Sequence, residues 1–373
     1  MDITLITVVA VALFFDFTNG FHDTANAIAT TVSTKALSPK LAVLGAAVFN
    51  FLGAFISLKV AGTVAKGIVN PDVITLHIVL AGLLGAIVWN IVTWRFGLPT
   101  SSSHALIGGV AGAAAAAVGL HAIKWQGLQD KVLVPSLVAP FLGLAGAGLI
   151  MFMIFKIIKK RSETKVHKVF KRLQLVSGSF VAFTHGTNDA QKTMGIIALA
   201  LLAANPGGTF HVPLWVVVSS AAAMAIGTYV GGWRIIHTLG NRVAKLEPQQ
   251  GFAAETSTAA TLGLTAHFGF PVSTTHTISG SILGAGASAK PMTVNWRVVR
   301  HIVAAWFITI PCAAAVGAIM ELMTRVSYGS EIAAAAGIIV VGTIFITRNW
   351  RWESMAQVRS RLALLIRVRR QHP

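Results

Sequence analysis

A polar motif of unusual composition occurs twice in this chain. Residues 96–113 read FGLPTSSSHALIGGVAGA, and residues 268–285 read FGFPVSTTHTISGSILGA. The two segments align without a gap at an offset of 172 residues. A second pair lies upstream, where TNGFHDTANAI (18–28) aligns with THGTNDAQKTM (184–194) at an offset of 166. A hydrophobic chain with such polar, Gly- and Pro-interrupted segments in both halves is expected to form two repeats with a site at their interface.

Long apolar stretches surround these motifs. The chain is 54% hydrophobic and 11% charged, with a mean hydropathy of +0.71, whereas soluble domains carry roughly 25% charged residues. The apolar runs are continuous, and most are near the ~20 residues that a helix needs to cross a bilayer. They predict an all-α polytopic membrane protein with about 10–12 membrane segments, rather than a β-barrel of alternating strands.

The duplication also predicts how the chain is divided. We expect a first transmembrane repeat over 1–157, a basic linker over 158–172 and a second repeat over 173–325. An extra transmembrane helix with a basic tail is expected over 326–373. If the repeats are inverted, each half must cross the membrane an odd number of times.

Basic residues are concentrated in two places, the linker and the tail, within a net charge of +18. Clusters of Lys and Arg beside membrane spans mark the cytoplasmic side of the membrane and favour contact with anionic lipid. We therefore predict a multi-pass protein of the inner (plasma) membrane, with the central loop and the C-terminus in the cytoplasm. A nucleic-acid partner is not expected, because both clusters flank spanning segments.

Each proline of the duplicated motif is followed by a hydroxyl run. Proline suits the first turn of a helix, so one helix should end near Gly97 or Gly269 and another should begin just after it. Unpaired N–H groups and the dipole at such a helix start suit a bound oxyanion. The alternative is ordinary capping with hydrogen bonds between helices, and duplication favours the anion site. The predicted anion-binding residues are Ser101, Ser102, Ser103, Ser273, Thr274 and Thr275. Periodicity is compatible with a re-entrant hairpin or with a turn between two full spans at each motif.

Acidic residues within apolar helices predict a second part of the site. A carboxylate in the hydrocarbon region is costly and usually functional. Asp23 and Asp189 occupy matching positions, and Asn26 and Asn188 lie beside them. Carboxylate and amide oxygens suit a hard cation such as Na⁺, and a carboxyl can instead take up H⁺. Glu255 is a further candidate, either as a coupling acid or as a structural partner.

Three smaller features complete the prediction. Lys192 follows Asp189 by three residues, and we expect an ion pair between them rather than a contact with the substrate. Gly20 and Gly186 are expected to let the backbone unwind beside each acid. The Gly-xxx-Gly pair in each duplicated segment predicts close packing of helices.

Five segments carry a resemblance to a known family. They are NGFHDTANAIAT (19–30), AAVFNFLGA (46–54), FGLPTSSSH (96–104), HGTNDAQKT (185–193) and FPVSTTH (270–276). On these segments the chain resembles the inorganic phosphate transporter (Pit) family, in its bacterial low-affinity branch, over roughly residues 10–325.

The resemblance implies a secondary active transporter, not an enzyme, that imports inorganic phosphate together with H⁺ or Na⁺. It implies that Asp23, Asn26, Asp189 and the two hydroxyl runs form the site. In some bacterial relatives the substrate is a metal–phosphate complex, so a divalent metal is a possible co-substrate. No cofactor is expected beyond the coupling cation, and a homo-oligomer is possible. Eukaryote-like members have Glu where Asn50 stands, which favours H⁺ over Na⁺ here.

Four other functions are compatible with parts of the sequence. A sulfate permease of the same family and a Na⁺-coupled phosphate symporter are the nearest alternatives. A passive anion channel would give currents that a pH gradient does not change. A membrane enzyme acting on lipid phosphates is disfavoured, because the sequence offers no activated nucleophile and no duplicated set of metal ligands.

Overall fold

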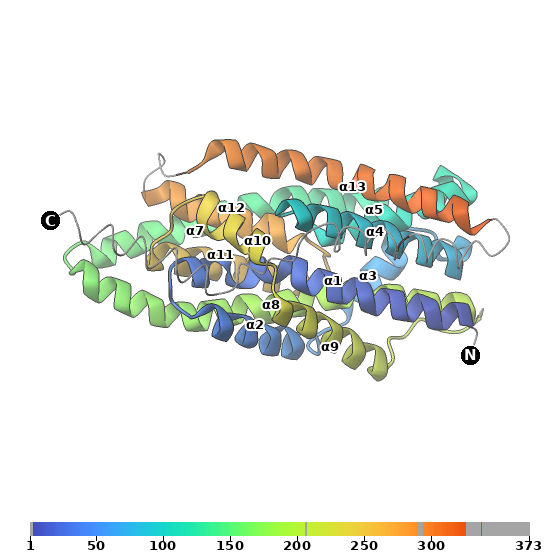
Figure 1. Ribbon diagram of the computed structural model, residues 1–373, viewed down its shortest axis with the longest axis horizontal. Helices are drawn as coiled ribbons and strands as arrows, with labels where there is room; N and C mark the ends of the chain where they lie inside the picture. Colours follow the sequence, from blue (N-terminus) through green and yellow to red (C-terminus); the bar gives the residue numbers. More distant parts are fainter. Residues whose placement is uncertain (1–2, 206, 290–293, 326–336, 338–373) are drawn as a thin grey trace.

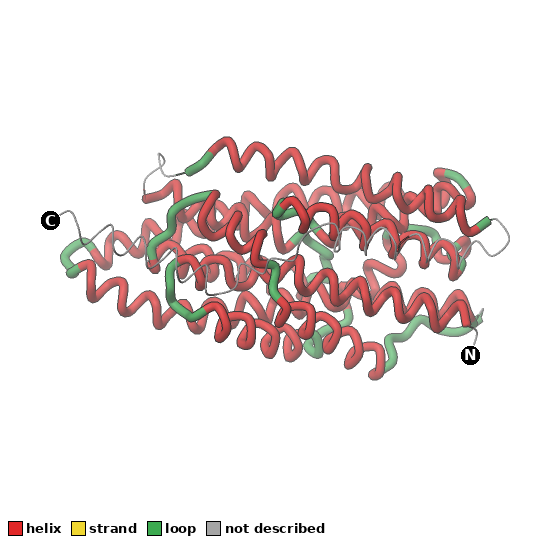
Figure 2. Tube along the Cα trace, viewed as in Figure 1, coloured by secondary structure: helices red, strands yellow, loops and turns green. Residues whose placement is uncertain are grey.

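A computed structural model describes residues 3–205, 207–289, 294–325 and 337 of this chain. Within these residues the chain is almost entirely helical, and the helices lie side by side in an elongated bundle (Figures 1 and 2). The all-α prediction is therefore confirmed. The predicted extra helix and basic tail, apart from Gly337, lie outside the described residues.

The first half contributes seven helices. They are α1 (Ile3–Ser33), α2 (Pro39–Gly53), α3 (Lys59–Gly67), α4 (Leu76–Phe96), α5 (Ser102–Val118), α6 (Trp125–Leu128) and α7 (Val134–Ile158). The described residues of the second half contribute six. They are α8 (Glu163–Ala204), α9 (Leu214–Val230), α10 (Trp233–His237), α11 (Pro248–His267), α12 (Thr274–Ala289) and α13 (Trp296–Thr324).

Most of the predicted basic linker is helical. The chain turns after α7, and α8 begins at Glu163, whose negative charge in the first turn suits the helix dipole. Lys165 and Lys168 are exposed on this first part of α8. The charges therefore do not break the helix, because they lie where solvent can reach them.

Four helices in the described part of the chain are long and apolar enough to cross a membrane by length and composition. They are α1, α4, the continuous stretch Trp125–Ile158, and α13. A bent pair, Leu214–Val230 and Trp233–Arg242, adds a fifth if it counts as one span, with an angle of 59° between its parts. The protein is thus an integral membrane protein. The motif helices α5 and α12 are shorter, with 17 and 16 residues, because each begins at an interior turn.

These interior turns confirm the predicted helix boundaries. Gly97 ends α4 with a φ of 66°, and Gly269 follows α11 with a φ of 76°, a backbone region that favours glycine. In the first turn, Thr100 and Ser101 are buried. Helices α4 and α5 then pack against each other, as α11 and α12 do, so each motif is the turn of a helical hairpin inside the bundle.

The two halves are interleaved rather than placed side by side. Helix α5 packs against α13 of the other half, and α12 packs against α7 of the first half. Helices α1 and α8 carry the matching acidic motifs, lie against each other, and run in opposite directions along the bundle (Figure 1). Both duplicated motifs therefore meet near the middle of one bundle.

Glycines make the interleaved contacts possible. A Cβ at Gly108 would lie 2.7 Å from the carbonyl oxygen of Ile310, and one at Gly112 would overlap the carbonyl of Ala314. At the matching positions, a Cβ on Gly280 or Gly284 would overlap a backbone carbonyl of α7. The predicted close packing of the Gly-xxx-Gly pairs is confirmed.

The predicted unwinding at Gly20 and Gly186 is wrong. Helices α1 and α8 are continuous through both glycines. A Cβ at Gly20 would overlap the carbonyl oxygen of Met224, and one at Gly186 would overlap that of Asn50. These glycines serve close helix packing, so the absence of a side chain matters there and backbone freedom does not.

Candidate functional site

The six predicted hydroxyl residues fall into three matched pairs. The first pair caps the motif helices: the backbone N–H of His104 donates to Ser101 Oγ at 3.1 Å, and that of His276 donates to Ser273 Oγ at 3.2 Å. These two oxygens therefore accept hydrogen bonds from the backbone of their own helices. For Ser101 and Ser273 the structure shows the helix-capping role that was the alternative to an anion site.

The second pair of hydroxyls contacts the acidic residues of the same half. Ser102 Oγ donates to Asp23 Oδ2 at 2.7 Å, and Thr274 Oγ1 donates to Asp189 Oδ2 at 3.2 Å. All four side chains are buried. The start of each motif helix is thereby tied to the acid of the matching repeat.

The third pair contacts the opposite half. Asn26 Nδ2 donates to Thr275 Oγ1 at 2.9 Å, and it also lies 3.1 Å from Thr274 Oγ1. Lys192 Nζ donates to Ser103 Oγ at 2.5 Å. The duplicated motifs, widely separated in sequence, are joined by these contacts into one buried polar cluster.

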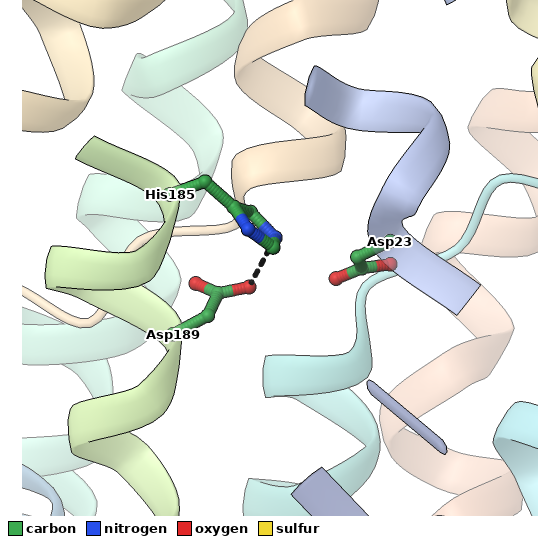
Figure 3. A group of neighbouring side chains, drawn as sticks. All are labelled: Asp23, His185 and Asp189. Atoms are coloured by element: carbon green, nitrogen blue, oxygen red, sulfur yellow. Dashed lines mark ion pairs between the residues drawn. The ribbon is translucent and has the colours of Figure 1, made fainter. Parts of the chain in front are cut away.

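The two acids lie close together at the centre of this cluster (Figure 3). Asp23 on α1 and Asp189 on α8 point toward each other and toward His185, and ligand atoms of the three side chains lie within 4.8 Å of one another. His185 Nε2 is 3.3 Å from Asp189 Oδ2. Two carboxylates and an imidazole are a donor set that holds a cation, including a divalent metal.

Each acid also has partners of its own. Asp23 Oδ1 lies 2.6 Å from His22 Nδ1, and His22 Nε2 lies 3.1 Å from Thr93 Oγ1. Asp189 Oδ1 accepts from Lys192 Nζ at 2.5 Å, so the predicted ion pair is confirmed. The carboxylates are thus held in place by neighbours that differ between the halves.

Two predicted amides have side-chain oxygens that accept no hydrogen bond from the described residues. Asn188 Nδ2 donates weakly to the Phe270 carbonyl at 3.4 Å. Asn26 Oδ1 and Asn188 Oδ1 are buried, and neither has a hydrogen-bond partner among the described residues. Burying an oxygen that accepts no hydrogen bond costs free energy, unless a ligand donates to it or a cation binds to it.

Glu255 does not join this cluster. It lies on α11 and accepts hydrogen bonds from Thr30 Oγ1 (2.7 Å), Thr31 Oγ1 (2.7 Å), Gln174 Nε2 (2.9 Å) and Ser177 Oγ (2.5 Å). Four donors hold the carboxylate in a separate polar cluster between α1, α8 and α11.

The motif histidines pair in a way that the sequence did not indicate. The rings of His104 and His276 meet edge to face with centroids 4.8 Å apart. His104 Nε2 lies 2.8 Å from Ser136 Oγ, and Trp306 stacks on His276 at 4.0 Å. Ser136 and Trp306 belong to helices of opposite halves, and neither stands in a duplicated motif.

Comparison with known proteins identifies the family of this chain. The profile of the phosphate transporter family matches residues 19–317. The chain belongs to the phosphate transporter family. It is 49% identical over 316 residues to a probable low-affinity inorganic phosphate transporter of Mycobacterium bovis, covering 84% of this chain and 76% of that protein. A protein of the same description from Bacillus subtilis is 46% identical over 326 residues, covering 86% and 97% of the two chains.

A solved structure has the same fold. The sodium-dependent phosphate transporter matches with a TM-score of 0.78 and 24% identity, over 87% of this chain and 99% of that one. The family consists of transport proteins and not of enzymes, so the lipid-phosphate enzyme considered above is excluded.

Proposed function

We propose that this protein is a secondary active symporter that imports inorganic phosphate with H⁺, and that the polar cluster at the starts of α5 and α12 is its transport site. One observation carries the proposal. Two hydroxyl-bearing helix starts from different halves meet there beside a pair of buried carboxylates.

The helix starts supply the anion-binding part. Each helix N-terminus carries unpaired N–H groups and about half a positive charge, and two such ends act on one small volume. Ser102, Ser103, Thr274 and Thr275 add hydroxyl donors once they turn from their present partners. A tetrahedral oxyanion has several acceptor oxygens and therefore matches donors that approach from two sides.

The carboxylates supply the coupling. An anion next to Asp23 and Asp189 is repelled by about 4 kcal/mol for each unit charge at 4 Å with an effective dielectric constant of 20. Uptake of H⁺ or a cation by the carboxylates removes this repulsion. Asn26 and Asn188 add neutral oxygens that can complete a cation site. Binding of the anion and binding of the cation then favour each other, which is the requirement for symport.

Glu255 is proposed as a second coupling acid. Thr30, one of its donors, lies four residues beyond Asn26 on α1, which is about one helical turn or ~6 Å along the axis. A proton could thus reach the anion site along one helix face. A change at Glu255 would require its four donors, Thr30, Thr31, Gln174 and Ser177, to rearrange.

A metal–phosphate complex is a second candidate substrate. Asp23, His185 and Asp189 present three ligand atoms within 4.8 Å of one another, and carboxylate oxygen suits Mg²⁺ or Ca²⁺. The metal would then occupy the acidic side of the cluster while the hydroxyls hold the phosphate.

The orientation in the membrane is proposed from the position of the basic residues and from the directions of α1 and α8. The antiparallel course of α1 and α8 supports an inverted repeat (Figure 1). The basic turn between α7 and α8 supports a cytoplasmic centre, as positive charge flanking short loops marks that side. The two motif hairpins then enter the protein from opposite faces of the membrane.

The decisive experiment is uptake of labelled phosphate and sulfate into proteoliposomes under imposed H⁺ or Na⁺ gradients. We expect phosphate to accumulate when the outside is acidic, with little competition from sulfate. Equal accumulation of both anions would favour the sulfate permease. Dependence on Na⁺ alone would favour a coupling like that named for the structural neighbour, and flux that no gradient concentrates would indicate a channel.

A further inference from the structure

The two halves differ at one charged position of the site. In the alignment of the acidic motifs, Asn26 of the first half stands where Lys192 stands in the second. The alignment of the hydroxyl motifs pairs Ser103 with Thr275, which are the hydroxyls that Lys192 and Asn26 contact. A neutral amide and an ammonium therefore occupy corresponding positions, each reaching across to the other half.

The ammonium of Lys192 is fully surrounded by protein oxygens. It donates to Asp189 Oδ1 at 2.5 Å, to Ser103 Oγ at 2.5 Å and to the Val272 carbonyl at 3.0 Å. The side chain is 2% exposed. An ammonium has three N–H donors, so these three acceptors account for all of them.

This saturation argues against a direct role in binding phosphate. A lysine that holds an anion keeps at least one donor directed at it, whereas Lys192 already donates to a carboxylate, a hydroxyl and a carbonyl. Those three oxygen types are the ligands that proteins use for hard cations. The position is therefore built as a cation site, and the side chain of Lys192 occupies it.

The corresponding position of the first half has the same kind of surroundings without a fixed charge. Asp23 matches Asp189, and Thr275 matches Ser103. Asn26 leaves its Oδ1 buried with no hydrogen-bond partner in the described part of the chain. That oxygen could coordinate a mobile cation held beside Asp23 and Asn26.

We propose that Lys192 is a resident cation, which replaces in the second half the mobile cation that the first half takes up with the substrate. This inference rests on the proposed symport function and deepens it. Lys192 sets the number and type of coupling cations: with Lys192 in place, one cation fewer needs to travel with each phosphate. It acts on the substrate through Asp189 and Ser103 and is thus a positioning residue.

The test is Lys192→Asn, which removes the ammonium and leaves the oxygens of Asp189, Ser103 and Val272 free to bind Na⁺, a hard cation. Phosphate uptake is measured in proteoliposomes with an external Na⁺ or choline gradient at equal pH and ionic strength. We expect wild-type uptake to be the same in both salts. We expect Na⁺ to stimulate the variant, within the roughly 5- to 150-fold range typical of coupling between two ligands. The variant should also carry one more positive charge per phosphate, measured as a shift in reversal potential.

Lys192→Arg is the matched control, since it keeps the charge and should show no Na⁺ stimulation.

Thermal unfolding of purified Lys192→Asn and Lys192→Gln in Na⁺ and in choline tests cation binding without transport. Na⁺ should raise the unfolding midpoint of both variants. Folded variants with neither stimulation nor stabilisation by Na⁺ overturn the proposal, as does an extra H⁺ in place of Na⁺. If no neutral variant folds, the Na⁺ dependence of wild-type uptake decides. Coupling of two Na⁺ to each phosphate would overturn the proposal, and uptake that is independent of Na⁺ would support it. Failure of wild-type phosphate uptake would instead refute the proposed function.

Discussion

The surroundings of Asp23 and Asp189 differ although the two acids stand at matching positions of a duplicated motif. Both accept a hydroxyl donor from the motif helix of their own half. Asp23 is further held by His22, the residue before it, whereas Asp189 contacts His185 one turn earlier and Lys192 one turn later. The duplication has thus kept the hydrogen bonds that build the site and changed the charge balance around each acid.

Matching geometry at the two acids therefore does not imply matching chemistry. The second-half acid already has a permanent counter-charge, and the first-half acid has an imidazole and a neutral amide nearby. Asp23 is therefore better placed to exchange a proton or a cation during transport, and Asp189 is better placed to hold the fixed framework.

Removing the acids should give the largest effects. Both Asp23→Asn and Asp189→Asn should abolish gradient-driven accumulation of phosphate. Asp23→Asn should retain exchange of phosphate for phosphate, because its role is exchange of the cation. Asp189→Asn should lose both and unfold at lower temperature, since breaking a buried ion pair costs about 3–5 kcal/mol. Accumulation and counterflow are measured in the same vesicles.

The matched control is the double variant Asp189→Asn with Lys192→Asn, which removes both charges of the pair. It should recover much of the lost thermal stability, because no unpaired ammonium is left buried. If both single variants still concentrate phosphate, these carboxylates are structural and Glu255 becomes the better candidate for the coupling acid.

Removing the motif hydroxyls that do not cap a helix should weaken transport without unfolding the protein. Ser102→Ala with Ser103→Ala, and Thr274→Val with Thr275→Val, delete donors from one half at a time. A hydrogen bond to a charged group is worth roughly 1.5–3 kcal/mol, so KM for phosphate should rise at least tenfold in each. Similar KM values in both double variants would support equal use of the two helix starts. Unchanged kinetics in both would contradict the proposed anion site.

Crowding the glycine contacts should reduce stability by a smaller amount. Gly112→Ala and Gly284→Ala each place a methyl group against a backbone carbonyl of the other half. Overpacking of this kind costs typically 1–3 kcal/mol, and the two effects should be similar because the contacts correspond. Gly45→Ala is the control, as nothing lies within 4 Å of its Cβ position. Thermal unfolding in detergent measures all three, and equal stability of all variants would contradict tight interleaving.

Introducing cysteines for labelling should leave transport unchanged. The labelling reports only which side of the membrane each position faces. Ser38 follows α1 and Thr209 follows α8, and both are exposed. An inverted repeat places them on opposite sides of the membrane. In a Cys312→Ala background, Ser38→Cys should react only with reagent admitted to the cytoplasm, and Thr209→Cys should react from outside. Labelling of both from one side would refute the inversion.

Local features of the fold were predictable because their signals act within a few residues. The ends of α4 and α11 follow from Gly97 and Gly269, which accept a left-handed backbone, and from the prolines that start new helices. The pairing of Lys192 with Asp189 follows from their spacing of three residues on one helix. Seven of the predicted anion- and cation-binding residues meet in one cluster, while Ser101 and Ser273 serve as caps, Asn188 donates to the Phe270 carbonyl and Glu255 lies apart.

The role of each glycine was harder to predict. A glycine in a helix signals either backbone freedom or close approach of another chain segment, and only the neighbour distinguishes the two. Gly20 and Gly186 have neighbouring backbones that would overlap a side chain. The sequence contains no local sign of these neighbours, because they come from helices distant in the chain.

The helical membrane class, the duplication of the motifs and the residue types gathered in them can be read from the sequence, since composition, period and helix-breaking residues act locally. Tertiary structure alone decided which hydroxyls cap a helix and which face an acid. It also decided that the halves interleave, so that Asn26 meets Thr275 across 249 residues of chain. The physical reason is that a hydrogen bond between distant residues depends on how whole helices pack, and that packing is set by many weak contacts which no short motif records.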